Sequence, residues 1–140
     1  MNHGRAIARK IPEGWAFSAW KAADGWAMRR YDWPQPDGRP SRGSLLFQTG
    51  RGDMPEKYLE ALAHWHAQGW TISGFDWRGQ GGSERELKNL RKGHVWDFAE
   101  YDKDLARFMK DVVLPDCPPP FMALAHSMGA LAGRVYIQEN

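Results

Sequence analysis

Residues 121–129 read Phe-Met-Ala-Leu-Ala-His-Ser-Met-Gly, and the fold of the chain can be argued from them. The five apolar residues 121–125 predict a strand, and the small residues after Ser127 predict a helix that runs to the last residue. A sharp strand-to-helix turn would present the Ser127 hydroxyl above the sheet and aim the helix N-terminus at a developing oxyanion. A serine at this place is also a common helix N-cap. Both interpretations of Ser127 predict a strand followed by a helix.

Upstream, strands and helices alternate. Residues 44–48 are almost continuously apolar, which is typical of a strand buried on both faces of a parallel sheet. Asp53 and Glu56 then form a capping box that predicts a helix ending at Gly69. Residues 70–75 predict the next strand.

A second predicted helix precedes the 121–125 strand. Asp97 and Glu100 form another capping box. Proline-rich residues 115–120 separate this helix from the strand. At helical spacing, its predicted buried stripe consists of Phe98, Tyr101, Leu105, Phe108, Met109 and Val112.

The N-terminal part has a different pattern. Residues 1–14 form an extension, and the aromatic-rich segments 15–20 and 26–33 predict two strands joined by a turn at Ala23-Asp24-Gly25. A proline-containing loop, 34–43, ends this hairpin. The whole order predicts the α/β class: a mostly parallel sheet with an antiparallel N-terminal hairpin and helices on both faces.

Composition narrows the possible partners. The 140 residues are 42% hydrophobic and 26% charged, which suits one globular domain or part of one. The net charge of +2 is spread along the chain, so we expect no nucleic-acid partner. The single Cys117 excludes an internal disulfide and suits a reducing compartment. Without a long apolar run or a signal-peptide pattern in residues 1–14, we expect a cytoplasmic location.

Two further motifs accompany the serine turn. Residues 76–83, Asp-Trp-Arg-Gly-Gln-Gly-Gly-Ser, follow a predicted strand, and residues 49–52, Thr-Gly-Arg-Gly, follow another. With Ala125-His-Ser-Met-Gly129 they resemble, in order, the motifs of α/β hydrolases, although Ala125 replaces the first glycine of the nucleophile elbow. Gly93-His-Val95 and the helix after it resemble the lysophospholipase pattern. From residue 15 onward the chain resembles the N-terminal half of lysophospholipase L2 and monoacylglycerol lipase-like hydrolases.

This resemblance implies a serine hydrolase that cleaves carboxylic esters through an acyl-serine intermediate. The substrates that it implies are lysophospholipid or monoacylglycerol. Ser127 would be the nucleophile, and the backbone N–H groups of Met128 and Arg51 would form the oxyanion hole. Asp76 and Arg78 would tie down their loop by hydrogen bonds. The resemblance implies no metal and no cofactor, and it allows peripheral membrane contact. A peptidase or another ester specificity stays open.

The rest of a catalytic triad does not follow Ser127. In this fold the acid and the histidine come after the nucleophile, and residues 128–140 contain neither His nor Asp. The upstream histidines at 64, 66, 94 and 126 are poor substitutes by position. We therefore expect a truncated hydrolase half that is inactive alone, whose partner is the missing C-terminal half of the same fold. Its 121–125 strand would be an open edge prone to association.

Two alternatives belong to other functional classes. One is a non-catalytic hydrolase scaffold that acts as an interaction module through its open sheet edge. The other, nucleotide binding at Gly79-x-Gly81, fails because Glu84 stands where the third glycine is required. The eight tryptophans could contact lipid, but core packing is the simpler expectation for aromatic side chains.

Overall fold

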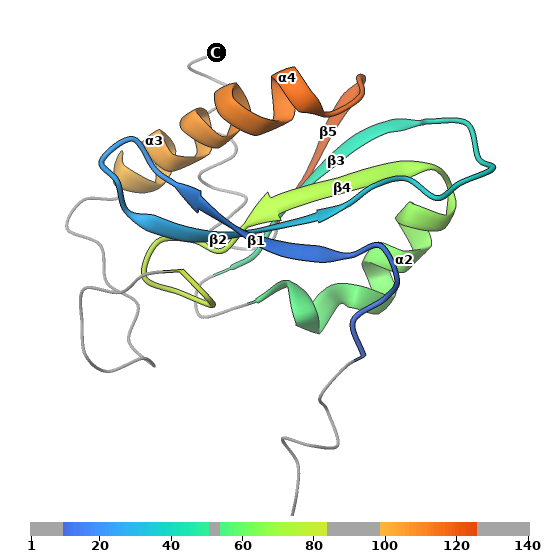
Figure 1. Ribbon diagram of the computed structural model, residues 1–140, viewed down its shortest axis with the longest axis horizontal. Helices are drawn as coiled ribbons and strands as arrows, with labels where there is room; N and C mark the ends of the chain where they lie inside the picture. Colours follow the sequence, from blue (N-terminus) through green and yellow to red (C-terminus); the bar gives the residue numbers. More distant parts are fainter. Residues whose placement is uncertain (1–9, 51–53, 84–98, 126–140) are drawn as a thin grey trace, which may run out of the picture.

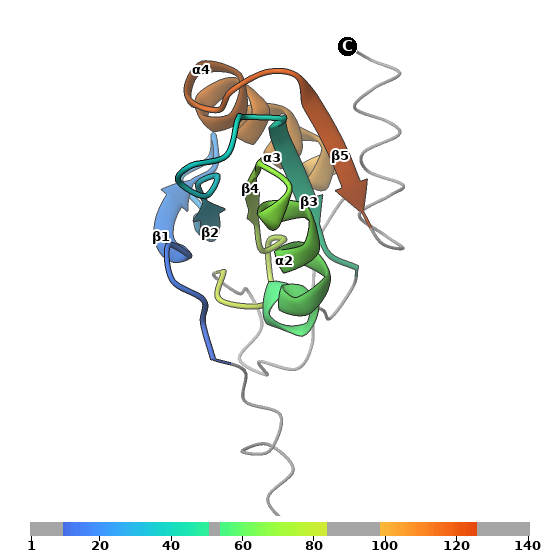
Figure 2. The ribbon, with the colours of Figure 1, turned by 90° about the vertical axis from the view of Figure 1, so that its right-hand side faces the viewer.

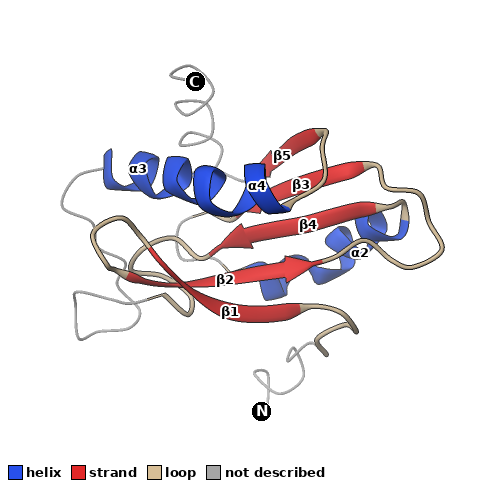
Figure 3. Cartoon of the chain, turned by 45° about the horizontal axis from the view of Figure 1, so that its top comes forward, coloured by secondary structure: helices blue, strands red, loops and turns tan. Residues whose placement is uncertain are grey.

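The computed structural model describes residues 10–50, 54–83 and 99–125. They form one five-stranded sheet with the order β1-β2-β4-β3-β5 (Figure 3). Its strands are β1 Ala16–Lys21, β2 Ala27–Trp33, β3 Gly43–Gln48, β4 Trp70–Phe75 and β5 Phe121–Ala125.

The strand directions confirm the predicted mostly parallel sheet with a hairpin at one side. β1 pairs antiparallel with β2, and β2 pairs antiparallel with β4. β3 pairs in parallel with both β4 and β5. Among the described strands β2 therefore runs against the other four.

Helices cover both faces of the sheet, as predicted (Figure 1). On one face lies α2, Leu59–Ala67, preceded by the 3₁₀ turn η1, Pro55–Tyr58. On the other lie α3, Ala99–Phe108, the π-helical turn η2, Met109–Val113, and the short α4, Leu114–Asp116. Each face has its own apolar cluster. Tyr31, Leu45 and Ile72 of the sheet pack with Leu62 of α2, while Leu46 and Phe75 of the sheet pack with Leu105 and Phe108 of α3.

The start of the first helix differs from its prediction. Asp53, the first residue of the predicted capping box, lies outside the described residues, and the N-cap of η1 is Met54, without a side-chain cap, with Pro55 in the first turn. The Glu56 carboxylate is bound instead by Arg29 of β2. The predicted end is confirmed: α2 stops at Ala67, and Gly69 has φ of +109°, a conformation that favours glycine.

The second helix keeps its predicted buried stripe over the described residues. Leu105, Phe108 and Met109 are buried. The sequence did not indicate the π turn, which places the consecutive Val112 and Val113 both in the core at 2% exposure. In a regular α-helix, consecutive side chains point about 100° apart around the axis. The π turn therefore widens the apolar face of this helical segment.

β3 and β5 have similar apolar sequences but opposite environments. All six residues of β3 are buried, since the strand lies between β4 and β5. β5 lies at the end of the strand order (Figure 2), and its residues Phe121, Met122 and Leu124 are 41%, 45% and 36% exposed. The predicted open edge at 121–125 is present in the described part of the chain.

Most described tryptophans belong to the core. Trp15, Trp20, Trp33 and Trp77 are buried, and Trp26, Trp65 and Trp70 pack partly buried against the two clusters. The expectation that these rings fill the core is confirmed for the described tryptophans.

Candidate functional site

The sheet register brings the carboxyl ends of β3 and β5 to one edge of the sheet. β3 and β5 are parallel neighbours in which Gln48 lies opposite Ala125. The chain therefore leaves both strands at the same carboxyl edge, where ligands bind in open α/β sheets. Arg51, Ser127 and Met128, the predicted oxyanion and nucleophile residues, lie outside the described residues, so their roles stay predictions.

The end of β3 is fixed from the hairpin side by Tyr31. Its buried hydroxyl donates to the Phe47 carbonyl oxygen at 2.7 Å. Gly74 of β4 makes this approach possible, because a Cβ there would lie 2.2 Å from the same oxygen and 2.6 Å from the Tyr31 ring. The glycine thus lets a side chain from β2 reach across β4 to β3.

Two more side chains fix the following residues. The amide of Gln48 accepts from the Phe75 N–H at 3.0 Å and donates to the Phe75 carbonyl at 3.2 Å. The indole N–H of Trp77 donates to the Thr49 carbonyl at 2.7 Å. All these groups are buried, so the chain enters residues 50–53 from a rigid start.

The segment that follows residues 51–53 is held by Arg29. Its guanidinium makes a two-bond contact with the Glu56 carboxylate at 3.0 and 3.1 Å and donates through Nε to Asp76 at 2.6 Å. Burial opposes its charge, but these two carboxylates outweigh burial and raise the pKa of Arg29. Arg29 therefore links η1 to the loop after β4.

Asp76 anchors that loop. Its Oδ2 also accepts the Gly82 N–H at 2.8 Å, and its backbone carbonyl accepts the Ser83 hydroxyl at 2.7 Å. Its Oδ1 is buried without a hydrogen-bond partner among the described residues. Burial is the main cause that raises the pKa of Asp76, against the opposing effects of Gly82 and Arg29.

Arg78 joins three parts of the fold. It donates to Asp104 of α3 at 2.8 and 2.9 Å and to Asp24 of the hairpin turn at 2.9 and 3.1 Å. These carboxylates, Asp104 first, raise the pKa of Arg78, and its hydrogen bonds lower the pKa of Asp24. The hydrogen bonds confirm that Asp76 and Arg78 tie down their loop.

Sequence reasoning missed the residues that hold the ends of β3 and η1: Arg29, Tyr31, Gln48, Glu56 and Trp77. One signal was available for the first of them, because Arg29 and Arg30 are adjacent charges inside a predicted strand. Charged residues in a strand need partners when they are partly buried. The identity of those partners depends on long-range pairing that local patterns do not contain.

The described histidines do not form a site. His66 stacks on Trp33 with ring centroids 3.7 Å apart and contacts the Pro34 carbonyl, whereas His64 contacts Gln68. Within residues 10–50, 54–83 and 99–125 no cluster of ligands suits a metal ion. His94 and His126 lie outside the described residues.

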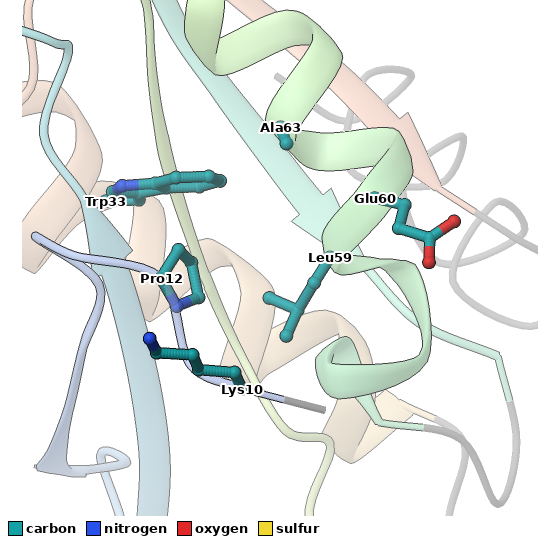
Figure 4. Close-up of a pocket in the computed structure, with 6 residues that line it drawn as sticks. All are labelled: Lys10, Pro12, Trp33, Leu59, Glu60 and Ala63. Atoms are coloured by element: carbon teal, nitrogen blue, oxygen red, sulfur yellow. The ribbon is translucent and has the colours of Figure 1, made fainter. Parts of the chain in front are cut away.

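A pocket of about 370 Å³ lies between the N-terminal segment, β2 and α2 (Figure 4). It is lined by Lys10, Pro12, Trp33, Leu59, Glu60 and Ala63. None of these residues is a serine, a threonine or a cysteine.

Comparison with known proteins identifies the family. A family model described as serine aminopeptidase, S33, matches residues 39–140, more than half of the chain. The chain belongs to this family of α/β hydrolases. The hydrolase is 33% identical over 96 residues to the probable lysophospholipase L2 of Haemophilus influenzae, an alignment covering 69% of this chain and 30% of that protein. With lysophospholipase L2 of Escherichia coli K12 the identity is 35%, covering 69% and 28%.

Solved structures confirm the fold. The α/β hydrolase GrgF from Penicillium sp. sh18 superposes with a TM-score of 0.72 at 17% identity, over 93% of this hydrolase and 43% of GrgF. The chain thus spans about 30% of the length of the curated relatives named above. The resemblance to lysophospholipase-like α/β hydrolases is confirmed.

No helix among the described residues is long and apolar enough to span a bilayer.

Proposed function

We propose that this chain supplies the nucleophile and the oxyanion hole of a serine hydrolase that cleaves carboxylic esters. The observation that carries the proposal is the parallel register of β3 and β5, with Gln48 opposite Ala125. This register starts residues 49–53 and 126–128 from neighbouring strands at one edge. A nucleophile on one segment and a backbone donor on the other would then face one carbonyl group.

In the proposed reaction the Ser127 oxygen attacks the ester carbonyl carbon, and its proton passes to a general base. The carbonyl oxygen becomes an anion that accepts hydrogen bonds from the N–H groups of Met128 and Arg51. Collapse of the tetrahedral intermediate expels the alcohol, which takes the proton, and leaves an acyl-serine. Water then hydrolyses this ester, releasing the acid and restoring the serine.

The fixed ends of β3 and η1 support this assignment. An oxyanion donor must be held in place before the charge develops, because preorganisation is what makes such donors effective. Tyr31, Gln48 and Trp77 hold the approach to residue 51, and the pair formed by Arg29 and Glu56 holds its exit. The base and the acid do not follow Ser127 in this sequence, so we expect little turnover from the 140-residue chain alone.

The proposed substrate class is a monoacyl lipid ester, lysophospholipid or monoacylglycerol. It is supported by the two lysophospholipase L2 relatives. The family description, a serine aminopeptidase, keeps a peptidase as the competing specificity. We further propose a cytoplasmic protein with peripheral contact to lipid, in which Cys117 stays a free thiol.

A serine-directed fluorophosphonate tests the nucleophile. An oxyanion hole without a complete triad still retains about 10³-fold acceleration over water. We therefore expect slow phosphonylation at Ser127, located by peptide mass spectrometry, that exceeds the rate in the urea-unfolded chain. Ser127→Ala should abolish this adduct.

Ser18→Ala is the matched control, because Ser18 is an exposed serine of β1 at the opposite side of the sheet. It should leave labelling unchanged. Equal rates in folded and unfolded chain, or an adduct that persists in Ser127→Ala, would contradict the nucleophile assignment.

A second function, a non-catalytic scaffold that binds through its sheet edge, is favoured by the exposed side chains of β5. Under this alternative the fluorophosphonate gives no folded-state adduct while binding through β5 persists.

A further inference from the structure

The pocket between the N-terminal segment, β2 and α2 has a buried apolar floor and an exposed rim (Figure 4). Trp33 and Leu59 form the floor and are 5% and 6% exposed, whereas Lys10 and Ala63 on the rim are exposed. Ligand sites usually measure about 300–1,000 Å³ and have mostly apolar walls with a few polar groups. At about 370 Å³ this pocket is near the lower end of that range, so it suits a small ligand.

The Trp33 ring is fixed in place within the protein itself. Its indole N–H donates to the Glu13 carbonyl oxygen at 3.0 Å, and the ring stacks on His66 with centroids 3.7 Å apart. Trp15 packs edge-on against the same ring at 5.7 Å. A ligand would therefore meet a preformed wall, and binding would not have to order this side chain.

The other walls of the pocket are also held by the fold. Pro12 lies in a turn, because its carbonyl oxygen accepts the Trp15 N–H at 3.2 Å. Leu59 at the start of α2 belongs to the apolar cluster between this helix and the sheet. The pocket therefore keeps its shape without a ligand.

Lys10 supplies the positive charge of the pocket. It has no ion-pair partner in the part of the chain that the structure describes. The other charged residue of the lining, Glu60, points its carboxylate away from the Trp33 ring (Figure 4). An ammonium group beside apolar walls suits a ligand that carries a single negative charge on a nonpolar body.

We propose that this pocket binds a short alkanoate, with the alkyl chain between Trp33 and Leu59 and the carboxylate bonded to the Lys10 ammonium group. The chain removes apolar surface from water, and the carboxylate forms a charge-assisted hydrogen bond. An alkanoate is also the product class of the ester cleavage proposed above. The hydrolase would thus bind its own product at this pocket, and only this link rests on the proposed function.

Titration of hexanoate into the ¹⁵N-labelled 140-residue chain tests the proposal. We expect saturable shifts of the Trp33 indole N–H signal and of amides around the pocket, with a dissociation constant of about 1 mM. Hexanol has the same alkyl chain without the charge, so it should bind at the same residues but more weakly.

Ala63→Leu and Ala61→Leu form a matched pair of variants. Both alanines are exposed residues of α2, and only Ala63 lines the pocket. Leucine is a good helix former, so both variants should keep the fold. We expect Ala63→Leu to fill the pocket and raise the dissociation constant of hexanoate at least about tenfold, whereas Ala61→Leu should leave it unchanged.

Lys10→Gln and Lys57→Gln test the contribution of charge. Both lysines are exposed, but Lys57 belongs to η1 and does not line the pocket. We expect Lys10→Gln to weaken hexanoate binding about two- to fivefold, the range of exposed ion pairs, and to leave hexanol binding unchanged. Lys57→Gln should change neither, and added salt should weaken hexanoate alone.

Hexanoate that gives no saturable shift would overturn the proposal. So would equal affinity in Ala63→Leu and the unmodified chain, or a loss in Lys10→Gln that hexanol shares. The fluorophosphonate assay reports on Ser127, which does not line this pocket, so the two proposals fail independently.

Discussion

Asp76 shows how a single buried carboxylate organises the region of the predicted site. It receives Arg29 and the Gly82 N–H on one oxygen, while the other oxygen has no partner in the described part of the chain. Even the glycine at 81 is required here, because a Cβ there would lie 2.4 Å from the Asp76 carboxyl group. The geometry leaves this carboxylate little contact with water to offset its charge.

The raised pKa of Asp76 has a consequence for stability. The folded state binds the proton more tightly than the unfolded chain, so the stability from this group is full below its unfolded pKa and is lost as pH rises through the folded pKa. We expect the free energy of unfolding, relative to Asp76→Asn, to fall as pH rises from 3.8. Urea unfolding of both chains from pH 4 to pH 8 measures this difference in the free energy of unfolding.

Asp37→Asn, a change of an exposed loop carboxylate, is the control for the same titration. It should keep the pH profile of the unmodified chain. A gain in stability with rising pH, relative to Asp76→Asn, would contradict the assigned direction.

At the scale of elements, Arg78 connects the hairpin turn, the loop after β4 and α3. The side chains of Arg78 and Asp104 are only 6% and 3% exposed, so the pair is shielded from water. Replacement by Met would leave the Asp104 carboxylate buried and unpaired. We expect Arg78→Met to cost about 3–5 kcal/mol of unfolding free energy.

The matched control is Arg107→Met. Arg107 and Asp111 form a 2.6 Å pair along α3 and η2, but the Arg107 side chain is 45% exposed. Exposed pairs of this spacing contribute about 0.3–0.5 kcal/mol. Equal losses in the two variants, measured by urea unfolding, would show that burial does not set the strength of the Arg78 contact.

The elements themselves were largely predictable. Alternating apolar runs and glycines located β3, β4, β5 and the end of α2, because these signals are local. The partner of Glu56 was not predictable, because Arg29 lies 27 residues away in sequence. The π turn at 109–113 was not predicted because its sequence, Met-Lys-Asp-Val-Val, is compatible with an ordinary helix.

At the scale of the whole molecule, burial was the property that local sequence could not supply. Residues 44–48 and 121–125 have similar patterns, yet among the described strands only the first has neighbours on both sides. In the candidate site, too, local sequence predicted one part and tertiary structure supplied the other. The motifs predicted which segments carry Ser127 and Arg51. The residues that hold the described chain on either side of residue 51 come from β2, the end of β3 and the loop after β4, and they are brought together only by tertiary pairing.

The order of the strands also has a practical consequence for protein engineering. β1, which follows the N-terminal segment, and β5 occupy opposite ends of the same sheet. A bulky fusion partner or a surface tether attached ahead of β1 would leave the far side unobstructed. A tether to a biosensor surface, or an affinity tag, is therefore better attached ahead of β1 in this hydrolase.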